Sequence, residues 1–63
     1  PIIHVEMFSG RDAETRKELV TALTKSYIEV CGGNPAGVHV ILQDVEKKNW
    51  AKGGKLFSDL LPD

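Results

Sequence analysis

Hydrophobic and polar positions follow three successive patterns along the chain. Residues 2–8 alternate between apolar and mixed positions, which predicts a β-strand with one wholly apolar face. From Ala13 to about Cys31 the apolar residues recur every three to four positions, which predicts an amphipathic helix of about five turns. Residues 38–45 alternate again and predict a second strand. The stripe of the helix expected to face the sheet comprises Leu19, Val20, Leu23, Tyr27, Val30 and Cys31.

Turn-forming residues mark the ends of these elements. Gly10 permits a turn after the first strand, and Asp12 is a good N-cap for the helix. Gly32 and Gly33 favour the helix C-terminus, and Pro35 prevents the helix from continuing.

The order strand, long helix, strand predicts an α+β fold built on one βαβ unit with two parallel strands and a crossover helix. In the tail, Gly53 and Gly54 near Trp50 predict a short C-terminal hairpin followed by an irregular apolar end. Residues 1–63 form a single domain on this interpretation. One helix covers only one face of the strands, so we expect two copies to pair into a dimer with a four-stranded sheet.

Composition and charge narrow the classes of function. The formal net charge is −1 and the charges are interspersed, so neither nucleic acid nor a membrane surface is an expected partner. No apolar run reaches transmembrane length, and no signal-peptide pattern precedes the first strand. Cys31 is the one cysteine of the sequence, so no intrachain disulfide can form. Its place on the helix stripe predicts a small core residue, and a lone thiol favours a cytoplasmic location. No zinc-ligand spacing is present, so oligomerisation is the expected source of added stability.

Pro1 is the most unusual chemical group in the sequence. At a chain terminus the proline ring nitrogen is a secondary amine rather than an amide. An α-amino group has an ordinary pKa of about 7.7–8.0, and burial or a nearby cation lowers it, so such an amine can act as a neutral base near pH 7. Removal of an initiator Met is the simpler explanation, and position alone favours it.

Arg11, His39 and Trp50 are further candidates, each with a plainer alternative. Arg11 lies on the turn before the helix, where a guanidinium can clamp a carboxylate in a bidentate pair. Alternatively, it is a surface arginine that pairs with Glu14 or another acid. His39 lies on the mixed face of the second strand, either as a hydrogen-bond donor or as a half-buried structural histidine. Trp50 either walls an apolar pocket or packs over a subunit junction.

Several features together resemble the 4-oxalocrotonate tautomerase family. No single feature is specific, but the combination is, and it extends over essentially the whole chain. The features are Pro1, the alternating first strand, Gly10–Arg11, a helix of this length, "VHVI" at residues 38–41, Trp50 and Gly53–Gly54.

The resemblance implies an isomerase, a keto–enol tautomerase whose βαβ subunits pair into dimers, commonly three dimers to a hexamer, with sites at subunit interfaces. A dimer is the smaller alternative. It implies that Pro1 is the general base, that Arg11 binds a substrate carboxylate, and that Trp50, helped by Phe8, keeps the site apolar. The implied substrate is a small carboxylate of the 2-hydroxymuconate or phenylenolpyruvate class, in aromatic catabolism, handled without a metal or an organic cofactor.

His39 departs from the family pattern, in which a second arginine stands at this position. In relatives that arginine engages the keto and carboxylate end of the substrate and polarises the developing enolate. Histidine is shorter, lacks the five-donor fork and need not be charged at pH 7. Either His39 stabilises the enolate as a shorter donor, or another group takes that role. A monoacid enol therefore competes with a dicarboxylate as substrate.

Two other functions stay open at this point. If Pro1 were protonated it would be a general acid, and His39 or a carboxylate such as Glu6 or Asp44 could activate water. The reaction would then be a hydration, a dehalogenation or a decarboxylation. The other alternative is a non-catalytic oligomeric module.

Overall fold

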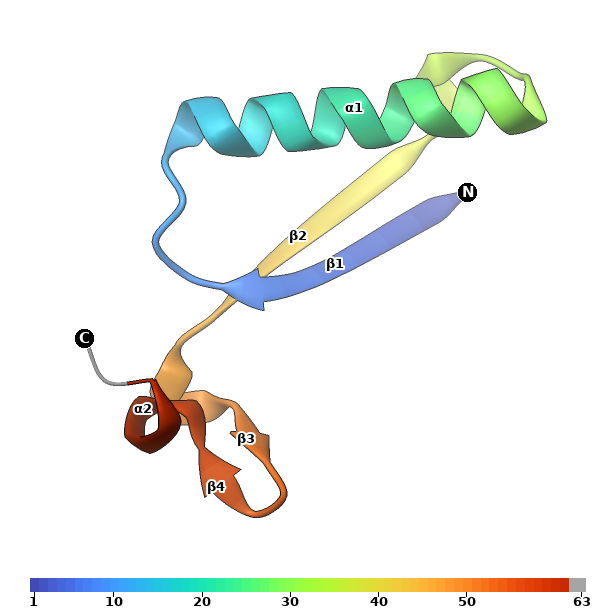
Figure 1. Cartoon of the computed structure of the whole chain (residues 1–63). Coiled ribbons are helices and arrows are strands. Elements are labelled where there is room, and N and C mark those ends of the chain that lie inside the picture. The colour runs from blue at the N-terminus through green and yellow to red at the C-terminus, as the bar shows by residue number, and fades with distance from the viewer. Residues whose placement is uncertain (62–63) are drawn as a thin grey trace.

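The chain forms one βαβ unit followed by a small C-terminal segment (Figure 1). The computed structural model describes residues 1–61 of the 63-residue chain. The order of elements confirms the predicted strand, long helix, strand and hairpin. In chain order these are β1 (Ile2–Phe8), α1 (Ala13–Cys31), the 3-10 turn η1 (Pro35–Gly37), β2 (His39–Val45), the 3-10 turn η2 (Lys47–Asn49), β3 (Ala51–Lys52), β4 (Lys55–Leu56) and α2 (Phe57–Leu60).

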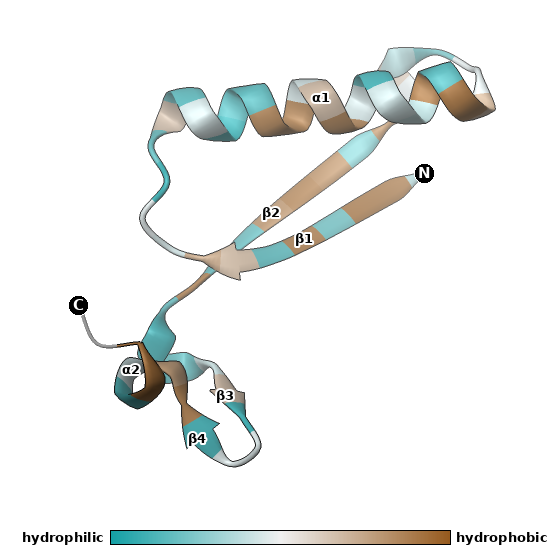
Figure 2. Ribbon diagram, viewed as in Figure 1, coloured by the Kyte–Doolittle hydropathy of each residue, from teal (hydrophilic) through white to brown (hydrophobic). Residues whose placement is uncertain are grey.

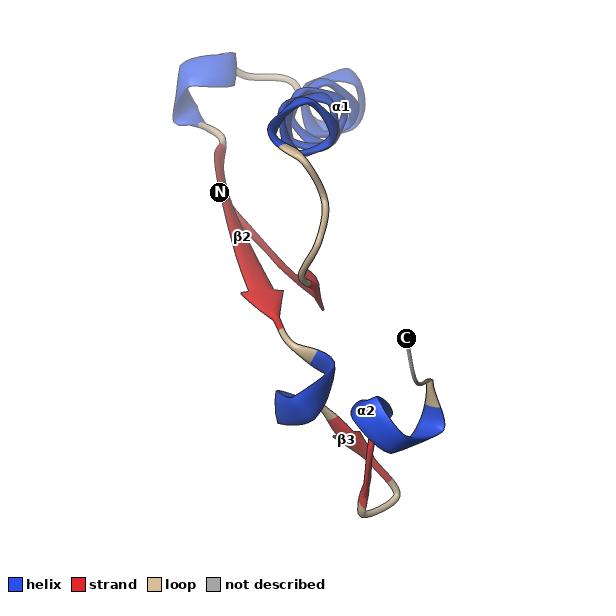
Figure 3. Cartoon of the chain, turned by 90° about the vertical axis from the view of Figure 1, so that its left-hand side faces the viewer, coloured by secondary structure: helices blue, strands red, loops and turns tan. Residues whose placement is uncertain are grey.

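The two long strands are parallel and lie in register from Ile2 opposite His39 to Phe8 opposite Val45. Figure 3 shows α1 on one side of this pair, with the other side uncovered. Figure 2 shows the apolar stripe of α1 turned toward the strands. On the uncovered side Ile2 is 71% exposed and Ile41 is 48% exposed, so apolar surface remains on the sheet. The alternate residues on the α1 side are half-buried: Ile3, Val5, Met7, Val40 and Leu42.

Local capping explains where α1 begins and ends. The backbone N–H of Thr15 donates to Oδ1 of Asp12 at 2.8 Å, as expected of an N-cap. This backbone hydrogen bond holds the pKa of the Asp12 carboxyl below its usual value. At the other end Gly32 takes φ +75°, a conformation that favours glycine, and its N–H donates to the Ile28 carbonyl at 2.8 Å.

Three details of the first prediction are wrong. Val38 lies outside β2, because its N–H closes the η1 turn by donating to the Pro35 carbonyl at 3.0 Å. Val30 and Cys31 do not face the sheet and are exposed, so Cys31 is not a core residue. The physical reason is length: a 19-residue helix spans about 28 Å and a seven-residue strand about 23 Å, so the last turn of α1 has no strand beneath it.

The C-terminal segment contains the predicted hairpin and a helical turn that was not predicted. β3 and β4 are antiparallel and pair Ala51 with Leu56. Gly53 and Gly54 take φ +60° and +79°, as a two-residue turn between such strands requires. The tail after the hairpin is not irregular throughout: α2 forms there, and the Leu61 N–H donates to the Phe57 carbonyl at 2.7 Å.

The shape of the chain is open and elongated. Its extents are 43 × 25 × 14 Å and its radius of gyration is 14.8 Å, where a compact 63-residue chain has about 11 Å. Within residues 1–61 no side chain is fully buried. In the same part of the chain no helix is long and apolar enough to cross a membrane. A single copy therefore leaves the mixed face of its sheet, with Ile2 and Ile41, open to another chain.

Candidate active site

The residues predicted for a site fall into two groups at opposite ends of the β1–β2 pair. Pro1 and His39 lie where the two strands begin, and we call this the proline end. Phe8, Arg11 and Trp50 lie where the strands finish, and we call this the arginine end. The seven residues of β1 separate the two ends by about 23 Å. One copy of the chain therefore does not bring all five residues together (Figure 1).

The proline end is held by the backbone. The N–H of His39 donates to the Pro1 carbonyl at 2.9 Å, which extends the strand ladder to the first residue. Both residues are exposed. His39 stands on the side of the sheet that α1 leaves uncovered, in the alternation shared with Ile41. The ladder thus fixes where the Pro1 ring nitrogen lies but leaves it accessible.

Arg11 is held at the end of β1, and no carboxylate of residues 1–61 pairs with it. Its Nη1 donates to the Phe8 carbonyl at 2.7 Å. Among residues 1–61 no acidic side chain forms an ion pair with Arg11, and Glu14 pairs instead with Lys17 at 3.7 Å. The plainer interpretation, in which Arg11 pairs with Glu14 on the surface, does not describe this structure. The guanidinium keeps donors available for an anion.

Arg16 and Asp44 support the turn that carries Arg11. Nη1 of Arg16 donates to the Arg11 carbonyl at 3.2 Å and lies 3.5 Å from Oδ2 of Asp44. Asp44, one of the two acids considered for activating water, is therefore engaged by a cation. Sequence reasoning missed this pair. The available signal was the alternation of β2, which puts Asp44 on the α1 side with Val40 and Leu42, where a carboxylate needs a cation.

Three aromatic rings form a cluster at the arginine end, which we call the aromatic trio: Phe8, Trp50 and Phe57. The ring centroids of Phe8 and Trp50 are 4.6 Å apart, those of Phe8 and Phe57 5.1 Å, and those of Trp50 and Phe57 6.0 Å. Phe57 was not predicted as part of a site. The signal was its spacing: Trp50 and Phe57 are equally distant from the Gly53–Gly54 turn, so a hairpin sets them opposite each other.

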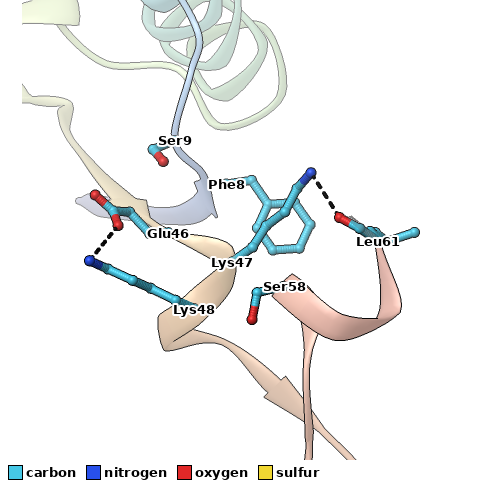
Figure 4. A pocket seen from close by; sticks show the side chains of 7 residues that line it. All are labelled: Phe8, Ser9, Glu46, Lys47, Lys48, Ser58 and Leu61. Carbon is cyan, nitrogen blue, oxygen red and sulfur yellow. Dashed lines mark hydrogen bonds and ion pairs between the residues drawn. The ribbon is translucent and has the colours of Figure 1, made fainter. Parts of the chain in front are cut away.

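A pocket of about 380 Å³ adjoins the trio, between the end of β1 and α2 (Figure 4). Nζ of Lys47 donates to the Leu61 carbonyl at 3.2 Å across this pocket, and Lys48 pairs with Glu46 at 3.3 Å. The Lys47 bond ties η2 to the end of α2, whereas the Lys48–Glu46 pair is local to η2. The pocket is lined by Phe8, Ser9, Glu46, Lys47, Lys48, Ser58 and Leu61. Over residues 1–61 no group of three His, Cys, Asp or Glu side chains is placed to hold a metal ion.

Comparison with known proteins identifies the family. The family model for tautomerase enzymes matches residues 1–60. A crystal structure of a 4-oxalocrotonate tautomerase homologue is similar to this chain, with a TM-score of 0.83, 40% sequence identity and 92% of each chain covered. The chain belongs to the 4-oxalocrotonate tautomerase family.

Other members of the 4-oxalocrotonate tautomerase family agree over nearly the whole length. A probable tautomerase of Staphylococcus epidermidis is 37% identical over 59 residues, which are 94% of this chain and 97% of the relative. The 2-hydroxymuconate tautomerase of Comamonas testosteroni is 33% identical over 60 residues, 95% of each chain. The protein is thus an isomerase of this family, and its βαβ unit with a C-terminal hairpin is the tautomerase fold.

Proposed function

We propose that the protein is a keto–enol tautomerase of small enol carboxylates, with Pro1 as the general base and Arg11 as the carboxylate-binding group. The observation that carries this proposal is the state of Arg11. Its guanidinium is anchored on the Phe8 carbonyl at 2.7 Å, beside the aromatic trio, and has no carboxylate partner within residues 1–61. Such a cation at an apolar wall suits an anionic substrate with an apolar remainder.

A second copy of the chain would complete the site. A two-fold axis that pairs two sheets edge to edge reverses one strand pair against the other. The proline end of one copy then meets the arginine end of its partner, and the joined sheet has four strands. The uncovered faces, on which Ile2 and Ile41 lie, would drive further association into a trimer of dimers. In this arrangement residues 1–63 act as one domain whose site is shared between copies.

The proposed chemistry moves one proton and needs no redox partner. Arg11 binds the substrate carboxylate through two parallel hydrogen bonds and orients the enol over Pro1. The neutral Pro1 nitrogen takes the proton of the enol hydroxyl, and the oxygen becomes a carbonyl as electrons shift to carbon. The protonated amine then returns that proton to the carbon. His39 donates a hydrogen bond to the oxygen on which charge develops, and Trp50 with Phe8 keeps water away.

The balance of cations and rings favours a monocarboxylate substrate. Of the residues given a role in the proposed site, Arg11 is the permanent cation, and His39 stands where the family has a second arginine. Three rings at the arginine end suit an aryl group better than a second carboxylate. We therefore favour an enol of the phenylenolpyruvate class over a dicarboxylate of the 2-hydroxymuconate class. A relative named 2-hydroxymuconate tautomerase supports the wider class of 2-hydroxy-dienoate and enol acids.

The test follows the ultraviolet absorbance of each enol as it ketonises, after intact mass has shown that the chain starts at Pro1. We expect Pro1→Ala to lower kcat by about 10²- to 10⁴-fold, the usual contribution of a general base. Pro35→Ala, in η1, is the matched proline control and should keep wild-type rates. Full activity in Pro1→Ala would refute the proposal.

A further inference from the structure

We infer that Phe57 is a positioning residue that holds Trp50 in place and so fixes the apolar wall of the site; this inference rests on the proposed function. The side chain of Phe57 is neither acidic nor basic, and Phe57 takes no part in the proton transfer proposed above. Its contribution lies in where its backbone and its ring stand relative to Trp50.

The backbone of the hairpin brings Phe57 and Trp50 together. Trp50 directly precedes β3 and Phe57 directly follows β4, so the two residues stand opposite each other at the open end of the hairpin. The Phe57 N–H donates to the Trp50 carbonyl at 2.8 Å. This bond continues the hairpin ladder by one step and fixes the Trp50 backbone relative to α2.

The ring of Phe57 then fixes the orientation of the indole. It meets Trp50 edge-on, at 6.0 Å and an interplanar angle of 87°, and meets Phe8 at 5.1 Å and 71°. Trp50 and Phe8 are themselves 4.6 Å apart with planes at 52°. All three separations fall in the range that aromatic pairs prefer. Without the Phe57 ring, Trp50 keeps one aromatic neighbour and gains space into which it can turn.

The same residue joins the C-terminal segment to the sheet. Phe57 is the first residue of α2, and its carbonyl accepts the N–H of Leu61 at 2.7 Å. Its ring contact with Phe8 is therefore a point at which α2 meets the end of β1. The Lys47 bond to the Leu61 carbonyl holds the other end of that turn. Loosening Phe57 would release Trp50 from α2 and leave the ring of Phe8 as its one aromatic neighbour.

Trp50 provides a direct readout because it is the only tryptophan of the chain. We expect Phe57→Leu, which keeps apolar bulk and removes the ring, to move the Trp50 emission to longer wavelength and to speed its anisotropy decay. With phenylenolpyruvate, KM should rise about three- to tenfold while kcat changes little, since the wall binds substrate and transition state alike. Phe57→Tyr keeps the ring and should retain wild-type emission and KM.

The matched control is Leu60→Ala, which shortens an apolar side chain of the same helical turn but removes no ring; it should leave the emission unchanged. If Phe57→Leu fails to fold, Phe57→Met makes the same comparison. If the Trp50 emission of Phe57→Leu is unchanged, whatever its KM, the inference is overturned. If the wild-type protein does not ketonise either enol, the proposed function fails, and the emission comparison still decides whether Phe57 positions Trp50.

Discussion

The two ends of the β1–β2 pair are held in place in different ways. At the proline end a ladder hydrogen bond joins the His39 N–H to the Pro1 carbonyl, and within residues 1–61 neither side chain forms a hydrogen bond. At the arginine end side-chain contacts fix the geometry. Arg11 donates to the Phe8 carbonyl, Arg16 donates to the Arg11 carbonyl, and the three rings of the aromatic trio pack together. Sheet register positions the residues of the proline end, and tertiary contacts position those of the arginine end.

This difference predicts where substitutions act. A register shared by seven residue pairs is insensitive to any one side chain, so changes at the proline end should affect chemistry and leave geometry intact. The arginine end depends on a few polar and aromatic contacts, so changes near it should move Arg11 or Trp50 and alter binding.

The strongest test mixes two inactive variants. If each site takes Pro1 from one copy and Arg11 from another, unfolding and refolding Pro1→Ala together with Arg11→Ala at equal amounts should restore about a quarter of the wild-type sites by random assembly. Ketonisation rates of the mixture and of each variant alone provide the measurement. Continued inactivity of a mixture whose exchange between copies is shown by mass spectrometry would place both residues in one copy.

Replacing His39 tests the proline end by itself. His39→Arg restores a second permanent cation, and we expect the ratio of kcat/KM for 2-hydroxymuconate over phenylenolpyruvate to rise about tenfold through one added charge-assisted contact. Steady-state rates with both enols give the ratio.

The matched control for that experiment is His4→Arg, on the same uncovered face, where His4 lies 3.1 Å from the Gln43 amide oxygen. It adds the same charge away from Pro1 and should leave the ratio unchanged. An equal rise in both variants would mean that general attraction, rather than a contact at position 39, selects the dicarboxylate.

Breaking the Arg16–Asp44 pair tests the arginine end. Arg16→Gln and Asp44→Asn should each raise KM about two- to fivefold, because the pair is partly exposed and acts on Arg11 only through its carbonyl. The double variant should raise KM by no more than the larger single effect, because both substitutions remove the same Arg16–Asp44 contact. Lys17→Gln, which breaks the nearby pair with Glu14, is the control. Fully additive single effects would show that the two residues act independently.

The smallest effect concerns the cap of α1. Because the folded-state pKa of Asp12 is lowered, the unfolded chain binds this proton more readily. The stabilisation is therefore present above the ordinary aspartate pKa of about 4 and is lost as pH falls through the lowered value. Asp12→Asn should remove that part of the pH dependence in denaturant unfolding, whereas Asp59→Asn should not. An unaltered acid slope in Asp12→Asn would contradict this assignment.

The sequence predicts the elements well where local rules decide them. Alternation predicts β1, and a 3.6-residue periodicity predicts α1. The helix begins after the N-cap Asp12, whose side chain accepts a backbone hydrogen bond, and it ends at Gly32, whose positive φ favours glycine. Prediction failed where one element depends on another. Val30 fits the helix stripe but has no strand beneath it, and α2 forms after a hairpin that ends at Leu56.

For the candidate site, the sequence offers candidate residues but not their arrangement in space. Pro1, Arg11, His39 and Trp50 were singled out by residue type and by resemblance. That they stand at two ends of one strand pair follows only from the register. Arg16 and Phe57 escaped notice because each acts through a contact between segments distant in sequence.

The parallel register also bears on how the chain folds. It pairs Ile2 with His39, so ladder partners are separated by more than half of the 63 residues. Closing so long a loop is slow unless α1 forms first and shortens it. Because no side chain of residues 1–61 is fully buried, little holds the closed chain until another copy arrives. We therefore expect refolding to be second order, its rate rising with protein concentration in stopped-flow experiments.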